Sequence, residues 1–134
     1  MKFKFIDHPK ILEAIILGNN LEELFSNAAL AMMTFLYPKE IGINDHESKE
    51  NIILKSSDHS ALLNNFLTEI LYLTKTKNIC YNSFDIIKLT DNTVELQAYG
   101  RRVKRQEIIN DLISHKTQIK PIEFGWEAVI IFDI

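Results

Sequence analysis

The C-terminus carries the most suggestive group of metal-ligating atoms in the sequence. Asp133 follows the apolar run 128–132, and the terminal carboxylate of Ile134 lies one residue further. Carboxylate oxygens that lie close together favour hard cations such as Ca²⁺ or Mg²⁺. Because Ca²⁺ usually takes about 6–8 oxygens, further ligands must come from elsewhere, and Asp7 with His8 is the natural source. The alternative interpretation is a polar strand end in water.

A basic segment follows Gly100 and is the second candidate site. Four of its five residues are cationic: Arg101, Arg102, Lys104 and Arg105. On a loop these side chains could contact phosphate groups or an acidic protein surface, so we interpret them, together with His8, as partner-binding residues. No aromatic residue alternates with the cations, which weakens the case for stacking on single-stranded bases. The alternative is a solvated loop.

Common catalytic signatures are missing from the sequence. It has no Gly-rich phosphate loop, no H-E-x-x-H zinc motif and no G-x-S-x-G nucleophile turn. The four histidines are scattered along the chain, although a triad assembled from distant residues stays open. Cys80 is the only cysteine, so it forms no internal disulfide, and we expect a buried structural thiol. We therefore predict no catalytic residues.

The composition predicts a single globular domain over residues 1–134. Hydrophobic residues make up 46% and charged residues 25% of the 134 residues, and a chain of this length folds without a disulfide or metal. A net charge of −3 argues against general nucleic-acid binding. The N-terminus lacks a signal-peptide pattern, and the apolar run 11–17 is too short to cross a membrane. We therefore expect a cytoplasmic protein.

Two amphipathic helices are predicted. The first has Asn20 as N-cap and Glu23 as its capping-box partner, and it runs to about Tyr37, before Pro38. The second begins after Asp58, and its apolar stripe includes Leu62, Phe66, Ile70 and Leu73. So broad an apolar face should pack against a sheet.

Strands are predicted for most of the remaining chain. They cover residues 2–5, 12–17, 51–55, 80–89, 94–99, 117–124 and 126–134. We expect a surface loop at 42–50, and either a loop or a short helix at 101–112. The run 128–132 is apolar at every position, which predicts a central strand covered on both faces. The fold class is therefore α+β, a two-layer domain with a mixed or antiparallel sheet and two helices packed on it.

Four segments of the chain resemble the archease family. Residues 20–32, NLEELFSNAALAM, are similar to its first helix, and residues 62–73, LLNNFLTEILYL, to its second. The opening FIDH at 5–8 and the closing WEAVIIFDI at 126–134 match the two ends of the family. The resemblance runs from residue 1 to residue 134 in the expected order.

The resemblance implies a cytoplasmic protein that assists an RNA ligase in tRNA splicing and RNA repair, is not itself an enzyme, and binds a divalent metal near its C-terminus. In the family, the metal carboxylates are the aspartate of a His-Thr-Ala-Asp motif and the penultimate aspartate, helped by the terminal residue. Asp133 and Ile134 keep the second half of that site, whereas Ile11 stands at the position of the motif aspartate. Lys10 beside it would repel a cation, and Asp7, four residues before Ile11, could swing in as a substitute. The resemblance thus implies a weakened metal site.

Two alternatives to this function stay open. One is a diverged module that binds protein or RNA through residues 101–105 without metal. The other is a metal-dependent hydrolase, which needs an intact metal site.

Overall fold

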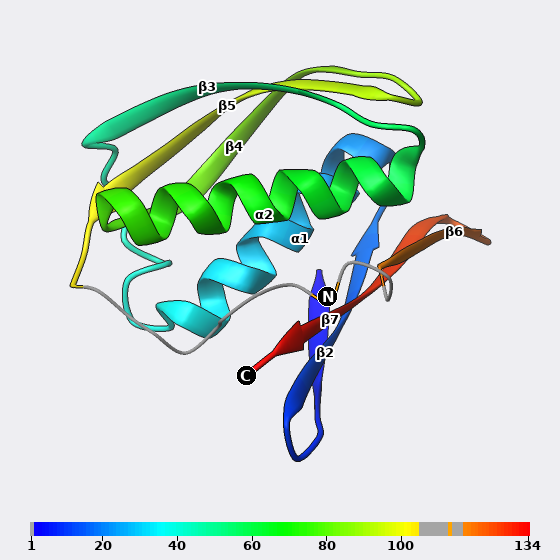
Figure 1. The fold of residues 1–134 in the computed structure, drawn as a ribbon, viewed down its shortest axis with the longest axis horizontal. Coiled ribbons are helices and arrows are strands. Elements are labelled where there is room, and N and C mark those ends of the chain that lie inside the picture. The colour runs from blue at the N-terminus through cyan, green and yellow to red at the C-terminus, as the bar shows by residue number, and fades with distance from the viewer. Residues whose placement is uncertain (1, 105–112, 114–116) are drawn as a thin grey trace.

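The computed structural model describes residues 2–104, 113 and 117–134. In chain order its elements are β1 (Phe3–Asp7), β2 (Ile11–Gly18), α1 (Leu21–Leu36), β3 (Ser48–Lys55), α2 (His59–Lys77), β4 (Ile79–Leu89), β5 (Thr93–Arg102), β6 (Gln118–Ile122) and β7 (Gly125–Asp133). The strands form a four-stranded sheet, β1-β2-β7-β6, and a three-stranded sheet, β3-β5-β4, with every neighbouring pair antiparallel. Both helices contact strands of both sheets (Figure 1). The α+β prediction is confirmed, although the strands form two sheets instead of one.

Helix α1 begins and ends where the local signals predict. The Asn20 side chain accepts a hydrogen bond from the N–H of Glu23 at 2.8 Å, which satisfies one of the free donors at the helix start. At the other end, the N–H of Tyr37 donates to the carbonyl of Met33 at 2.7 Å. Pro38 follows and has no N–H with which to continue the helix.

Helix α2 is capped at both ends. The Asp58 side chain accepts from the N–H of Ala61 at 2.8 Å. Asn78 takes a left-handed conformation, with φ of 55°, and its N–H donates to the carbonyl of Thr74 at 2.9 Å. Lys77 in the last turn complements the negative end of the helix dipole. Within the described part of the chain, no helix is both long and apolar enough to cross a membrane.

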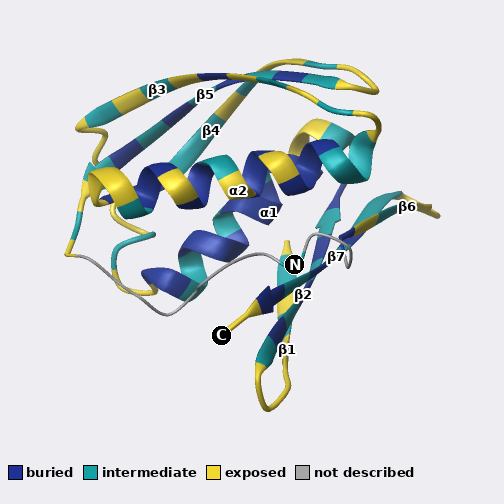
Figure 2. Cartoon of the chain, in the orientation of Figure 1, coloured by how far each residue is buried: buried dark blue, intermediate teal, exposed yellow. Residues whose placement is uncertain are grey.

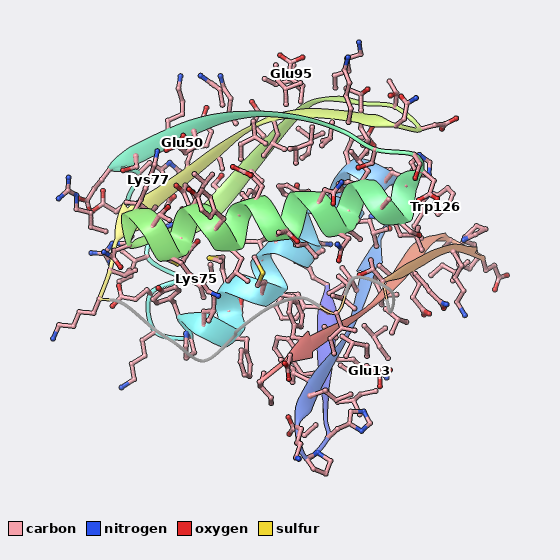
Figure 3. The ribbon with its side chains drawn as sticks, viewed as in Figure 1. Glu13, Glu50, Lys75, Lys77, Glu95 and Trp126 are labelled. Atoms are coloured by element: carbon pink, nitrogen blue, oxygen red, sulfur yellow. The ribbon has the colours of Figure 1, made fainter. Side chains whose placement is uncertain are left out.

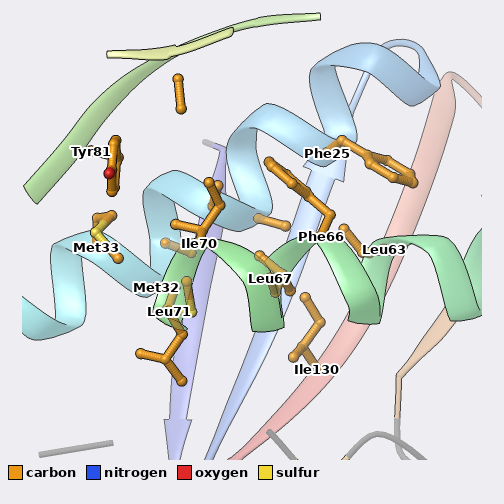
Figure 4. Packing of buried hydrophobic residues seen from close by; sticks show 14 of the residues in the cluster. Phe25, Met32, Met33, Leu63, Phe66, Leu67, Ile70, Leu71, Tyr81 and Ile130 are labelled. Atoms are coloured by element: carbon orange, nitrogen blue, oxygen red, sulfur yellow. The ribbon is translucent and has the colours of Figure 1, made fainter. Parts of the chain in front are cut away.

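The core lies between the helices and the two sheets. The rings of Phe25 in α1 and Phe66 in α2 stack with their centroids 6.0 Å apart, and Phe66 meets Phe84 of β4 edge-on at 5.9 Å. Met32 and Met33 are fully buried in the same cluster (Figure 4). Burial is concentrated on the helices and on the strand faces that they cover (Figure 2). This packing fixes the positions of the strand ends, which carry the candidate sites.

Strand β7 occupies the predicted central position, between β2 and β6. The prediction that both its faces are covered is wrong. Ala128, Ile130 and Phe132 face the helices and are at most 1% exposed, whereas Val129 and Ile131 on the other face are partly exposed. The reason is that the helices pack on only one face of the four-stranded sheet.

Strand β3 begins at Ser48, earlier than the predicted start at residue 51. Its polar first residues, 48–50, pair with residues 98–100 of β5. Because β3 is an edge strand, where charged side chains are common, hydropathy did not indicate these residues. Strand β5 also runs on to Arg102, and residues 105–112 of the ambiguous segment lie outside the described residues.

The turn between β6 and β7 depends on a glycine. Gly125 has φ of +147°, and a Cβ at this position would lie 2.2 Å from the carbonyl oxygen of Gly18. Only glycine tolerates both the backbone angle and this close approach. The turn is therefore held against the end of β2.

Candidate functional site at the end of the four-stranded sheet

The end of β7 lies beside the turn between β1 and β2. Ile11 of β2 stands directly opposite Asp133 of β7. The N–H of Ile134 donates to the carbonyl of Lys10 at 3.2 Å, and the N–H of His8 donates to the carbonyl of Ile11 at 3.3 Å. The backbone of residues 8–11 is therefore adjacent to the last two residues of the chain.

Asp7 and Asp133 project from opposite faces of this sheet. Asp7 pairs with Leu12, which in turn pairs with Phe132, so all three side chains share the face toward the helices. Asp133 pairs with Ile11, one position along, and shares the other face. Two strand spacings of about 4.8 Å also separate β1 from β7. The structure therefore does not bring the carboxylates of Asp7 and Asp133 together.

His8 and Glu13 lie on the same face as Asp133. His8 Nε2 and Glu13 Oε1 are 3.0 Å apart, with side chains 40% and 25% exposed. Glu13, which Figure 3 labels, pairs with Ile131, and this register places it diagonal to Asp133. Glu13 was not among the predicted site residues. The signal that could have found it is strand alternation, which places Ile11 and Glu13 on one face.

These residues do not fit the divalent cation that the family resemblance implies. The Ile11 side chain opposite Asp133 has no lone pair to donate, and Asp7 points to the other face. Within the described residues, no three His, Cys, Asp or Glu side chains are grouped so that they could hold a metal ion. A single aspartate neutralises and coordinates a hard cation poorly.

The predicted basic segment is divided between two environments. Arg101 Nη1 donates to Glu40 Oε2 at 2.8 Å, and the Arg101 side chain is only 22% exposed. Arg102 and Lys104 are exposed. Arg105 lies outside the described residues. Arg101 is therefore engaged by the segment that follows α1, which leaves Arg102 and Lys104 as the accessible cations among the described part of the segment.

Cys80 is fully buried, as predicted for a structural thiol. Burial, followed by the negative charge of Glu40, raises the pKa of this thiol to about 12, against a lowering by Arg101. Such a thiol stays protonated at neutral pH and is a poor nucleophile.

The described histidines occupy separate places, as their spacing indicates. The ring centroids of His46 and Tyr99 are 5.5 Å apart, whereas His59 Nε2 lies 3.3 Å from Asp91 Oδ1. His115 lies outside the described residues. Neither His46 nor His59 contributes to the surface around Asp133.

These observations define the class of protein. It is an α+β protein in which two antiparallel sheets enclose two capped helices, and in which the turn between β1 and β2 lies beside the end of β7. A model of the Archease protein family (MTH1598/TM1083) matches residues 3–134, and the chain belongs to this family.

Relatives named Protein archease align over essentially the whole chain. The protein from Methanosarcina acetivorans is 25% identical over 142 residues, covering 99% of this chain and 96% of the relative. The one from Archaeoglobus fulgidus is 28% identical over 140 residues, covering all of both.

Two solved structures have a similar fold. The solution structure of Methanobacterium thermoautotrophicum protein 1598 has a TM-score of 0.80 at 23% identity, covering 99% of both chains. The crystal structure of a Thermotoga maritima archease, described as a possible chaperone, has a TM-score of 0.64 at 18% identity, covering 98% of this chain and 96% of the other. At these identities the likeness shows the fold.

Proposed function

We propose that this chain is a non-catalytic, cytoplasmic accessory protein that assists an RNA ligase in tRNA splicing and RNA repair. The observation that carries the proposal is the family match over residues 3–134. Because the match extends over nearly all of the given sequence, the ligase-assisting role that the family resemblance implies is proposed for the whole of this fold. The description of the Thermotoga maritima relative as a possible chaperone is compatible with assistance to another protein.

The contacts of the chemically reactive residues support a binding role. His8 pairs with the carboxylate of Glu13, and Cys80 is buried with a raised pKa. Both His8 and Asp133 are exposed at the sheet end, where a partner protein could contact them. We therefore propose the outward surface of His8, Glu13 and Asp133 as the contact with the ligase.

We propose that this chain assists the ligase with a weakened metal site at Asp133 or with none. Ile11 opposite Asp133 removes one oxygen ligand, and Asp7 lies on the wrong face to replace it. A divalent ion bound elsewhere in the ligase complex is compatible with this proposal. The partner contact itself then depends on the shape and hydrogen bonding of the sheet end.

A ligation assay with the RNA ligase of the same cell tests the proposed function. Added wild-type protein is expected to raise the number of ligation turnovers per ligase. The double substitution His8→Ala/Glu13→Ala should reduce this stimulation by about tenfold, as expected for loss of one or two interface hot spots. Because Lys120 and Glu127 form a comparable ion pair, 3.5 Å long, on the same sheet, Lys120→Ala/Glu127→Ala is the matched control and should retain the stimulation. Unchanged turnover with wild-type protein would refute the proposal.

A second candidate function is favoured by the exposure of Arg102 and Lys104. It is the binding of RNA or protein through the basic segment, without metal. Because Arg101 is paired with Glu40, this function needs cations from other elements.

A further inference from the structure

A basic concavity lies where α2 ends beside the edge strand β3. It has a volume of about 520 Å³ and is lined by residues of β3, α2, β4 and β5: Ser48, Lys49, Glu50, Lys77, Ile79 and Arg102. Three of these side chains are cationic and one is a carboxylate, which leaves an excess of two positive charges. Of these residues only Arg102 was predicted as a binding residue, because the others come from distant parts of the chain.

Backbone pairing brings these elements to one place. Strand β5 continues two residues beyond Gly100, which stands opposite the first residue of β3, and Arg102 pairs with Ile79 at the start of β4. The carbonyl of Asn78, the C-cap of α2, accepts a hydrogen bond from the N–H of Val103 at 2.9 Å. The end of α2 and the end of β5 are therefore tied together, which holds Lys77 close to Arg102.

The cations in the concavity are only partly neutralised. Lys77 pairs with Glu50, and their side chains are 50% and 24% exposed (Figure 3). Lys49 and Arg102 are exposed and make no ion pair with another described residue. Two cations therefore remain available to a ligand, beside a third whose charge is shared with Glu50.

We propose that this concavity binds phosphate groups of a nucleic-acid backbone. Lysine and arginine side chains supply charge-assisted donors for phosphate oxygens, and the Ser48 hydroxyl adds a neutral donor. Among the residues that the structure describes, no aromatic side chain lines the concavity, so we expect contact with the backbone without stacking on bases and without sequence preference.

The lining favours a phosphate backbone over an acidic peptide. Protein interfaces are dominated by buried aromatic or aliphatic anchors in pockets. The apolar member of this lining, Ile79, is 4% exposed and offers no such anchor surface. The inference rests on the second candidate function, for which it names the additional cations and the ligand. It does not depend on the ligase role, because RNA binding can be measured with no ligase present.

Fluorescence anisotropy with a short labelled single-stranded RNA of mixed sequence tests this site. With three cations engaged, log K should fall with log salt with a slope of about −2, since each phosphate contact on a single strand contributes about −0.7. The variant Lys49→Gln/Arg102→Gln should reduce the slope to about −0.7 and weaken binding by about tenfold or more at low salt. Arg102→Lys, which keeps the charge, should bind nearly as wild type does.

Lys55→Gln/Lys88→Gln is the matched control. Both lysines are exposed on the three-stranded sheet and outside the concavity, so the same net charge is removed. This variant should bind RNA within about twofold of wild type. All of these side chains are exposed, and unchanged melting temperatures will show that each variant is folded.

Four results would overturn the proposal. Equal weakening in both double variants would show a general charge effect, and RNA binding that does not respond to salt would exclude phosphate contact. Displacement of the RNA by a polyglutamate peptide that binds more tightly would identify an acidic protein as the ligand. Displacement by low concentrations of inorganic phosphate would instead identify free phosphate.

Discussion

Replacing Ile11 by aspartate should convert the end of the four-stranded sheet into a divalent-cation site. Ile11 stands opposite Asp133 on neighbouring antiparallel strands, so the two Cβ atoms are about 4.5–5.5 Å apart on one face. The variant would place two carboxylates there, with Glu13 diagonal on the same face. Such a group of oxygens suits Ca²⁺.

The expected effects on stability have opposite signs with and without metal. Two charges about 5 Å apart repel by about 1 kcal/mol in water and about 3 kcal/mol at an effective dielectric of 20. The exposed position of Asp133 favours the lower value. Ca²⁺ at about 100 times its Kd would contribute about 2.7 kcal/mol, which exceeds this repulsion. The metal should therefore raise the melting temperature of Ile11→Asp by several degrees.

Thermal unfolding in EDTA and in millimolar CaCl₂, supported by titration calorimetry, measures these effects. Wild-type protein should show little change between the two conditions. Ile15→Asp is the matched control. Ile15 is on the same face of β2, but the residue directly opposite it on β7 is Val129, which has no carboxylate. Equal responses of the two variants to Ca²⁺, or a strong response of the wild type, would refute the reasoning from strand register.

Three further predictions concern stability. Gly125→Ala should lower the free energy of unfolding, measured by urea titration, by more than about 2 kcal/mol. The reason is that alanine is strained at φ of +147° and that its Cβ would lie 2.2 Å from the carbonyl oxygen of Gly18. A loss below about 0.5 kcal/mol would contradict this. Asp58→Ala removes the cap of α2 and should cost about 1 kcal/mol in the same titration, whereas Asp58→Asn, which keeps the acceptor, should cost less. Burial raises the pKa of the Cys80 thiol from 9.0 to about 12, so the unfolded chain loses this proton first as pH rises. Stability should therefore fall above pH 9 by up to about 1.4 kcal/mol per pH unit from this group, and Cys80→Ala should show a smaller fall.

The helices were predictable because their signals are local. Asn20 and Asp58 cap the N-termini that the sequence predicts, and Pro38 follows the end of α1. Each of these effects involves residues within one turn, which a sequence pattern contains. The division of the strands between two sheets was not predictable, since pairing joins segments far apart in the chain.

The candidate site was only partly predictable, because strand register decides it. The residues after β1 do lie beside the C-terminus, but a shift of one residue sends a side chain to the opposite face of a sheet. The alternation of side chains along the strands places Asp7 and Asp133 on opposite faces of the sheet, and it places Glu13 on the same face as Asp133. Likewise, the cations that accompany Arg102 come from β3 and α2, and no pattern near Gly100 indicates them.

Ile11 is singled out both by the family resemblance and by the register of the strands. The family resemblance places the missing motif aspartate at this position, and the register of β2 with β7 places the same residue opposite Asp133. The register owes nothing to the resemblance, because it follows from backbone pairing alone. Both therefore select the same pair of positions, Ile11 and Asp133, for a test with a second carboxylate. The wild-type chain can still present a defined polar surface to a partner, since the backbone hydrogen bond from the N–H of Ile134 to the carbonyl of Lys10 holds the strand end in place without a metal. The Ile11→Asp variant therefore tests whether this backbone arrangement holds a cation once a second carboxylate is supplied.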